Sequence, residues 1–461
     1  MIVNFAERAH NHNWELDPVT RSLLDTDFYK LLMLQFIWKH YPKTCVSFSL
    51  VNRSTWIRLA DMIKPEELSA QLEHARRLQF RKSELISLAG NTFYGQRGIF
   101  EPAFLAWLER DFKLSDYDLS VQDGQFHLCF HGWWTATTMW ELYALSIIDE
   151  LKTRANLKRL SEFGLDILYA RAKTKLWGKI EKLCGVPGLR LADFGTRRRH
   201  SFLWQEYVVE AMAANLGTAF IGTSNAFLAY KHDLEAIGTN AHEIPMVVAA
   251  LAPDDDALKT SQYRVLENWQ SSYQGELLIM LPDTFGTTQF LKDAPDWTAD
   301  WTGQRIDSKD PYIAGDEYIE WLNMRGREPR NKLIIASDAL DVDDVLGLHA
   351  YFGGTILSGT RPSDFRTAGD FLDRRKWIPE RRIRFSAGWG TLLTNDFRGC
   401  DPQGDNGFDP ISLICKVHEV EGHPAIKLSD NYAKALGPPS EINRYRRVFG
   451  TAGISNVPVI T

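Results

Sequence analysis

The sequence predicts an α/β protein that combines an irregular (β/α) barrel domain with an α+β domain. Three observations predict this class. Short apolar runs alternate with helical patterns between residues 156 and 404, which is typical of a parallel sheet with crossover helices. Residues 1–155 instead mix helices with alternating strands, and residues 405–461 return to the alternating pattern. We therefore assign 1–155 and 405–461 to one α+β domain with an antiparallel sheet, and 156–404 to a catalytic barrel-like domain.

The composition narrows the functional classes. The 53 Lys and Arg residues against 59 Asp and Glu residues give a net charge of −6, which argues against a general nucleic-acid-binding protein. Five cysteines lie far apart without a CxxC pair, which is typical of reduced thiols in the cytoplasm. The first residues lack the apolar core of a secretory signal, and no stretch approaches 18 uncharged apolar residues. We therefore expect a cytoplasmic protein that does not enter a membrane.

The N-terminal region shows helix and strand patterns in turn. Apolar residues at helical spacing predict a first helix, with Asp25 or Thr26 as its N-cap. A strand pattern follows at 44–54, and Asp123-Gly124 is a hairpin turn between two alternating arms. Further helices are predicted at residues 65–78, 102–112 and 137–152, and a further pair of strands that rejoins this sheet at residues 411–430.

Seven apolar runs in the central region are predicted strands. Each is followed by a polar loop and most by a helical pattern, so the strands should be parallel. A weaker eighth run is GTILSG at residues 354–359. Seven or eight such strands favour closure into a barrel, although an open sheet would show the same alternation. The seven runs are residues 189–194, 218–222, 234–238, 276–282, 302–307, 332–338 and 382–388.

The loops after these strands carry residues suited to anion binding. Arg197 opens a run of three arginines just before a helix, where anions bind favourably. Consecutive arginines are more often a solvated surface run, but these follow a buried strand, so we favour anion binding. Gly388, Gly390 and Thr391 would let backbone amides approach a phosphate. Because the C-terminal ends of barrel strands share one rim, we expect these loops to meet there.

Acidic residues and one histidine complete the candidate site. Arg305 and Asp307 leave one strand on the same side, so they can converge on a ligand or form an ordinary ion pair. Asp338 at a strand tip is a candidate substrate-binding residue. His242 has no second histidine at metal spacing, so no protein-bound metal site is predicted. A lone histidine is more often structural than catalytic. The place of His242 at a strand end beside Glu243, which could orient the imidazole or raise its basicity, strengthens the catalytic alternative.

Taken together, these motifs resemble the nicotinate phosphoribosyltransferase family along nearly the whole chain. The matching segments are LLDTDFYKLLM, DFGTRRRHS, FIGTSNAFLA, IGTNAHE, DTFGT, RIDSKDP, SDALD, SAGWGTLLTND and VHEVEGHPAIKLSD. The resemblance implies that nicotinate and 5-phosphoribosyl-1-diphosphate (PRPP) form nicotinate mononucleotide and diphosphate, for NAD biosynthesis. It also implies Mg²⁺, ATP as a co-substrate, no organic prosthetic group, and a homodimer with active sites at the subunit interface. ATP hydrolysis would be coupled through a phosphorylated histidine, which the resemblance places at His242.

The resemblance also implies roles for individual residues. Tyr29, from the partner subunit, and Phe194 would stack on the two faces of the pyridine ring. Arg305 and Thr223 would hold the nicotinate carboxylate, and Asp307 would serve the ribose and the positive charge that develops at its C1 carbon. The residues that would hold phosphate and diphosphate are Arg197, Gly388, Gly390 and Thr391.

Ser224 bears on the choice of substrate. Relatives that use nicotinamide have an aspartate at this position, and an aspartate would repel the carboxylate of nicotinate. The nearest alternative function is therefore nicotinamide phosphoribosyltransferase. A metal-dependent barrel hydrolase or aldolase is an alternative from another class, and a non-catalytic protein would be expected to lack the motif residues. Lys309 and Trp389 depart from the family pattern, which usually has a glycine and a smaller aliphatic residue.

Overall fold

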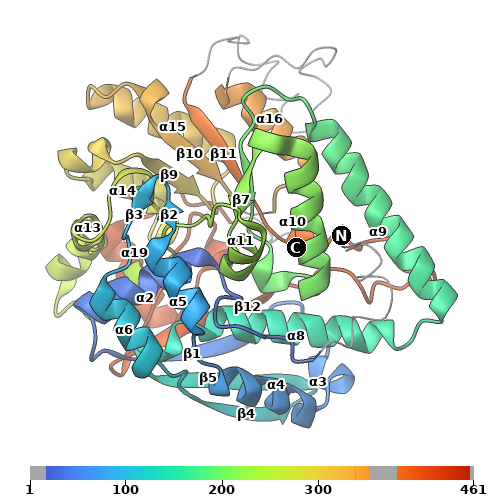
Figure 1. The fold of residues 1–461 in the computed structure, drawn as a ribbon. Coiled ribbons are helices and arrows are strands. Elements are labelled where there is room, and N and C mark those ends of the chain that lie inside the picture. Colours follow the sequence, from blue (N-terminus) through green and yellow to red (C-terminus); the bar gives the residue numbers. More distant parts are fainter. Residues whose placement is uncertain (1–16, 338, 354–381, 457–461) are drawn as a thin grey trace.

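The computed structural model describes residues 17–337, 339–353 and 382–456. It contains a six-stranded parallel sheet, whose strands β9, β10 and β11 lie in the upper half of Figure 1. The strand order is β7-β6-β11-β10-β9-β8, and each neighbouring pair is parallel. The parallel sheet expected from the alternating patterns is therefore confirmed. Its strands are β6 (Leu191–Asp193), β7 (Phe220–Thr223), β8 (Ile279–Met280), β9 (Gly303–Ile306), β10 (Leu333–Ala336) and β11 (Arg384–Trp389).

Closure of this sheet into a barrel stays a prediction. The expected strand at 234–238 makes a single bridge, between Thr223 and Ala236, because Gly238 turns the chain with φ 153°. A Cβ at Gly238 would lie 2.8 Å from the backbone nitrogen of Tyr29, so only glycine fits this turn. The expected strand at 354–359 lies outside the described residues. Within the described residues, strand pairing does not join β7 to β8.

A five-stranded antiparallel sheet unites the two ends of the chain. Its order is β13-β12-β1-β5-β4, so a C-terminal strand pairs directly with the first strand, as expected. The turn between β4 and β5 has positive φ at Asp123 (52°) and Gly124 (73°), which is the geometry of a tight hairpin. The strands are β1 (Cys45–Asn52), β4 (Asp116–Gln122), β5 (Gln125–Trp133), β12 (Leu413–Val420) and β13 (His423–Pro424).

Helix α2 (Phe28–His40) begins later than the sequence predicted. Its N-cap is Asp27, not Asp25 or Thr26. The side chain of Asp25 instead accepts hydrogen bonds from Arg199 and Asn225, which hold it away from the helix end. The other helices of this region are α3 (Leu59–Met62), α4 (Pro65–Arg77), α5 (Lys82–Gly90), α6 (Pro102–Arg110) and α7 (Trp134–Thr137), and a two-stranded hairpin joins β2 (Thr92–Phe93) to β3 (Gln96–Arg97).

Helix α8 (Trp140–Leu157) connects the two sheets. Nearly all of its residues are buried, and it contacts both β12 and the turn η2 (Thr196–Arg198) that follows β6. The expected domain boundary at residue 155 falls inside this helix, and the division into domains stays a prediction.

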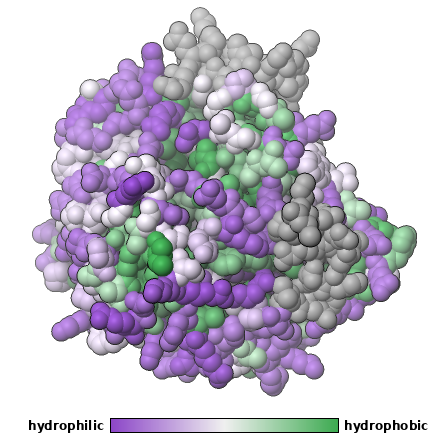
Figure 2. Space-filling model, viewed as in Figure 1, coloured by the Kyte–Doolittle hydropathy of each residue, from purple (hydrophilic) through white to green (hydrophobic). Residues whose placement is uncertain are grey.

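The remaining helices flank the parallel sheet or cover its loops (Figure 1). They are α9 (Glu162–Leu183), α10 (Phe202–Leu216), α11 (Ala226–His232), α12 (Glu243–Ala250), α13 (Asp255–Gln270), α14 (Thr287–Asp293), α15 (Pro311–Met324), α16 (Val342–Gly353), α18 (Thr391–Thr394) and α19 (Pro439–Phe449). Hydrophilic residues are spread over the visible surface (Figure 2). None of the described helices is long and apolar enough to cross a membrane, and the five cysteines are free thiols.

Candidate active site

The loops at the C-terminal ends of the parallel strands enclose a cavity of about 220 Å³. The structure brings nine of the candidate residues named above into its wall. Strands of the antiparallel sheet complete the cavity, because Ile414 and Lys416 of β12 also line it. The nine candidate residues are Tyr29, Phe194, Arg197, His242, Arg305, Asp307, Gly388, Gly390 and Thr391.

The cavity wall is strongly cationic, although the chain as a whole is acidic. Among the described lining residues Asp307 is the single carboxylate, against eight arginines and lysines. Like charges concentrated around a concave surface attract ligands of the opposite sign, so the cavity is suited to a polyanion. The eight cationic residues are Arg53, Arg197, Arg198, Arg305, Arg398, Lys416, Lys427 and Lys434.

Two aromatic residues share this cavity. Phe194 follows β6, and a Cβ at Gly388 would lie 3.2 Å from its ring, so glycine gives the ring its room. Tyr29, the second residue of α2, is only 3% exposed and lines the cavity of its own chain. The expectation that Tyr29 reaches into a partner subunit's site stays a prediction, because the structure describes a single chain.

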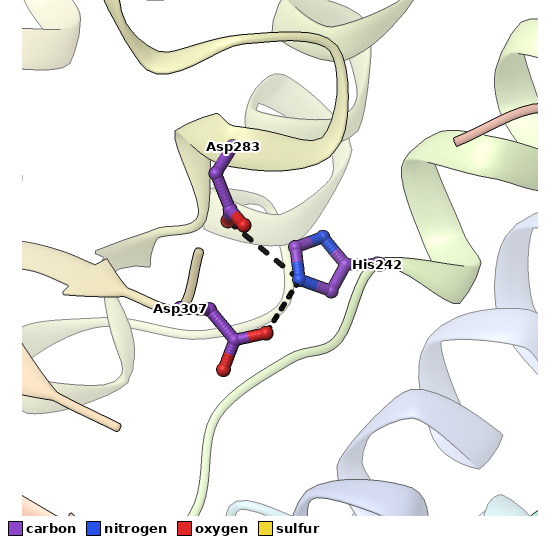
Figure 3. A group of neighbouring side chains, drawn as sticks. All are labelled: His242, Asp283 and Asp307. Carbon is purple, nitrogen blue, oxygen red and sulfur yellow. Dashed lines mark hydrogen bonds and ion pairs between the residues drawn. The ribbon is translucent and has the colours of Figure 1, made fainter. Parts of the chain in front are cut away.

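His242 points towards the carboxylates of Asp283 and Asp307 (Figure 3), and the Thr284 hydroxyl lies at its other ring nitrogen. Its Nδ1 is 2.9 Å from Thr284 Oγ1, and its Nε2 is 2.9 Å from Asp307 Oδ2 and 3.6 Å from Asp283 Oδ1. One potential ligand atom from each of His242, Asp283 and Asp307 lies within 4.8 Å of the others. Asp283 is held in turn by Ser308, whose Oγ donates a 2.7 Å hydrogen bond to its Oδ2.

The electrostatic environment keeps the imidazole neutral and Asp307 ionised. Burial lowers the pKa of His242 to about 4, although Asp283 and Asp307 oppose this shift. Burial would raise the pKa of the Asp307 carboxyl, but Arg305 and His242 hold it well below its ordinary value. Because an ionised carboxylate only accepts, the Nε2–H of His242 donates to Asp307, and the ring carries its lone pair on Nδ1.

A pH profile tests the state of His242. We expect any reaction that uses its lone pair to keep its rate from pH 7 down to about pH 5, and to fall as the pH approaches about 4. The free energy of unfolding should already fall as the pH drops from about 6.5 to about 4, because in this range the unfolded imidazole binds a proton that the folded one does not. Circular dichroism at each pH separates the two effects. An acid midpoint near 6.5 in folded protein would contradict the buried, neutral state.

Arg305 links the histidine loop to β9. Its NH1 donates to the backbone oxygen of Asn240 at 3.2 Å, and its NH2 lies 3.6 Å from Asp307 Oδ1. The two residues form an ion pair and both line the cavity, whereas their convergence on a ligand stays a prediction.

Glu243 does not orient His242, which corrects the sequence expectation. Its carboxylate accepts 2.6 Å hydrogen bonds from Trp134 Nε1 and Thr138 Oγ1, and it forms an ion pair with Lys30. Glu243 is the first residue of α12, where successive side chains point in different directions. The residues that hold the imidazole come instead from β9 and from the turn before α14.

Thr223 and Ser224 lie behind the cavity wall and are fully buried. Thr223 Oγ1 donates to Asp193 Oδ2 at 2.7 Å, and Ser224 Oγ donates to Asp27 Oδ1 at 2.7 Å. Neither is a lining residue, so a role in binding would be exerted through their neighbours.

Three further residues named from the sequence lie off the cavity or outside the described structure. Asp338 lies outside the described residues. Lys309 bonds Thr288 Oγ1 (2.8 Å) and Glu317 Oε2 (2.5 Å), so this cation is turned away from the cavity. Trp389 is buried, and its Nε1 donates a 2.8 Å hydrogen bond to the backbone oxygen of Leu340.

Sequence reasoning missed Asp283 and several lining cations. Asp283 stood in the DTFGT motif, and Lys427 stood in the C-terminal motif, so both could have been found there. Lys416, Arg53 and Arg398 lie outside every quoted motif, and the sequence offers no signal for them.

Comparison with known proteins identifies the family. The N-terminal domain of the nicotinate phosphoribosyltransferase (NAPRTase) family matches residues 24–149, and the NAPRTase family itself matches residues 189–360. Together these matches cover more than half of the chain. The chain belongs to the nicotinate phosphoribosyltransferase family. It is therefore an enzyme that transfers a phosphoribosyl group.

Solved structures of this family share the fold. A nicotinate phosphoribosyltransferase from Vibrio cholerae is 28% identical, with a TM-score of 0.77 over 94% of each chain. A putative one from Saccharomyces cerevisiae is 25% identical, with a TM-score of 0.75 over 95% of this chain and 99% of that one. A third, from Porphyromonas gingivalis, is 24% identical and matches in fold, with a TM-score of 0.76 over 94% of this chain and all of that one.

Proposed function

We propose that the protein forms nicotinate mononucleotide and diphosphate from nicotinate and PRPP, in NAD biosynthesis in the cytoplasm, and couples this reaction to ATP hydrolysis. The observation that carries the proposal is the cavity of this family member, which places two aromatic rings among eight cations. A flat anionic pyridine and a sugar with several phosphates need these two kinds of surface together.

The residues around the cavity fit the parts of the two substrates. Arg197 and the backbone of Gly388–Thr391 would bind phosphate and diphosphate, and Tyr29 and Phe194 would enclose the pyridine ring. Arg305 would meet the nicotinate carboxylate as a charge-assisted hydrogen-bond donor. The pyridine nitrogen attacks with its own lone pair, so the transfer needs no general base.

Asp307 would stabilise the transition state. Loss of diphosphate from C1 leaves positive charge on the ribose, and an ionised carboxylate held at fixed geometry favours that charge. Arg305 and His242 keep Asp307 ionised and oriented. The sugar-like cation therefore develops beside a charge that is already in place.

Mg²⁺ is expected to accompany the phosphates of the substrates. Asp283 and Asp307 offer the hard oxygen ligands that this ion prefers, and Asp283 Oδ1 is buried without a hydrogen-bond partner, which fits a cation ligand. These two carboxylates would hold Mg²⁺, which would neutralise charge on the departing diphosphate. No organic prosthetic group is required.

His242 would accept the γ-phosphoryl group of ATP. The N–P bond forms as the bond to the ADP oxygen breaks, and a neutral imidazole is a competent nucleophile for this step. The low pKa of His242 supports this role, because the ring stays unprotonated at neutral pH. Hydrolysis of the labile N–P bond would then release the stored free energy.

Product formation from labelled nicotinate, PRPP and Mg²⁺, with and without ATP, tests the proposal. We expect nicotinate mononucleotide in both cases and more of it with ATP. Nicotinamide is added as a competitor, and nicotinate is expected to win, because Ser224 stands where nicotinamide-using relatives have an aspartate. A preference for nicotinamide would favour the nicotinamide phosphoribosyltransferase alternative. Turnover that needs a bound metal but no PRPP would favour the hydrolase or aldolase.

Mixing a Tyr29→Ala variant with a His242→Ala variant is expected to restore some ATP-coupled activity, because we propose that Tyr29 serves the site of a partner subunit. One site of a hybrid dimer would then combine the intact His242 of one subunit with the partner subunit's Tyr29. The measurement is coupled turnover after incubation under conditions that exchange subunits, with sedimentation to detect the homodimer that we propose. No recovery despite proven subunit exchange would contradict a role of Tyr29 in the site of a partner subunit.

A further inference from the structure

One buried carboxylate behind the cavity wall contacts cations from both sheets. Glu141 of α8 is only 1% exposed and is not itself a lining residue. Its Oε1 lies 2.6 Å from Lys416 Nζ and 3.6 Å from Arg197 NH1. Lys416 belongs to β12 of the antiparallel sheet, whereas Arg197 lies in the turn after β6 of the parallel sheet. Glu141 is thus the shared partner of two lining cations that distant parts of the chain supply.

Glu141 is itself held in place. Its Oε2 lies 2.8 Å from Lys30 Nζ, and Lys30 also forms an ion pair with Glu243. Burial would raise the pKa of the Glu141 carboxyl, but Lys30, Lys416 and Arg197 keep it below its ordinary value. The carboxylate therefore stays ionised with both oxygens committed, one towards Lys30 and the other towards the cavity wall.

The two lining cations need such a partner. Arg197 and Lys416 repel each other, and a low-dielectric interior strengthens this repulsion. Without a shared carboxylate, the lysine would turn away from the arginine before an anion arrived. With the carboxylate, both cations keep their position in the free protein.

We propose that Glu141 is a positioning residue for diphosphate binding, which sets Arg197 and Lys416 side by side on the cavity wall. The inference rests on the proposed function in one respect, namely that the anion is a diphosphate. Glu141 would touch no substrate itself. It would act through Arg197 and Lys416, which would contact the diphosphate.

If Glu141 acted only through its negative charge, its removal would change the affinity for an anion in the opposite direction. A carboxylate behind the wall reduces the attraction between the cavity and an anion, so its removal alone would tighten anion binding. If Glu141 instead holds two cations in place, its removal weakens binding. The direction of the change therefore separates the two possibilities.

The test measures binding of inorganic diphosphate to the full chain by isothermal titration calorimetry. Glu141→Gln is expected to bind about tenfold more weakly, as for loss of a close charge partner. In turnover assays it should raise the KM for PRPP by a similar factor and leave kcat within about twofold. The matched control is Glu150→Gln, a buried carboxylate of the same helix that pairs with Arg154 and should bind diphosphate unchanged. Unchanged or tighter binding by Glu141→Gln would overturn the inference.

Two further variants keep the inference falsifiable if Glu141→Gln does not fold. Glu141→Asp keeps the charge but moves the carboxylate back by one methylene, and weaker diphosphate binding is expected. Binding equal to that of the unaltered protein would contradict a positioning role. In a Lys416→Met background, Glu141→Asp should weaken binding less than it does alone, because one of the two cations has gone, and full additivity would also contradict the proposal.

The same measurements separate the two levels of inference. If the unaltered protein fails to bind diphosphate, the proposed function falls, and the role of Glu141 falls with it. If the unaltered protein binds diphosphate and the Glu141 variants bind it equally well, the role of Glu141 alone is wrong.

Discussion

His242→Ala is expected to abolish ATP hydrolysis, by a factor of at least about a thousand, while slow phosphoribosyl transfer continues at high PRPP. The variant lacks the only atom proposed to accept the γ-phosphoryl group, but it keeps the aromatic rings and the lining cations. The measurement compares release of inorganic phosphate from ATP with formation of nicotinate mononucleotide, each with and without ATP. ATP should no longer stimulate transfer.

A matched control separates this effect from the loss of any imidazole. His418 is exposed on β12 and does not line the cavity, so His418→Ala should retain ATP hydrolysis and its coupling. Full coupled turnover by His242→Ala would remove the basis for a phosphorylated histidine at this position.

Asp307→Asn is expected to slow phosphoribosyl transfer by about 10² to 10³-fold, whether or not ATP is present. The substitution keeps the volume of the side chain but removes the charge beside the ribose. It also removes the ionic partner of Arg305 and weakens the acceptor for His242. The measurement is kcat for nicotinate mononucleotide at saturating substrates. The substitution removes more stabilisation from the transition state than from the bound substrate. The value of kcat should therefore fall by a larger factor than the affinity for PRPP.

Asp310→Asn is the matched control for Asp307→Asn. Asp310 is the N-cap of α15 three residues further along, and asparagine caps helices equally well. This variant should keep full activity. A comparable loss in both variants would mean that the loop, and not the carboxylate of Asp307, carries the effect.

The sequence predicts the parallel strands and the gathering of their loops because both depend on local patterns. An apolar run of strand length between helical patterns identifies a parallel strand, and parallel strands bring their C-terminal ends to one edge. Residues as far apart as Phe194 and Gly388 therefore meet at one cavity, as expected. The alternating pattern shared by the two ends of the chain predicted that the C-terminal strands rejoin the N-terminal sheet, and the pairing of β12 with β1 confirms this.

Other features depend on tertiary geometry that no local pattern carries. Glu243 follows His242 directly, yet the start of α12 turns its carboxylate towards Lys30. Whether Tyr29 serves the cavity of its own chain or that of a partner subunit depends on how two chains assemble, and not on which residues α2 contains. The ion pairs of Glu141 with Lys416 of β12 and with Arg197 after β6 depend on the position of α8 between the two sheets.

The pairing of β1 with β12 has a consequence during synthesis of the protein. The ribosome completes β1 at Asn52 and reaches β12 only at Leu413, so one edge of β1 waits for its neighbour. At ordinary translation speeds this wait lasts roughly 20 to 70 seconds, during which an open strand edge can pair with other chains. The nascent polypeptide should therefore need shielding by chaperones. It should also be unable to capture PRPP until the strand that carries Lys416 has left the exit tunnel.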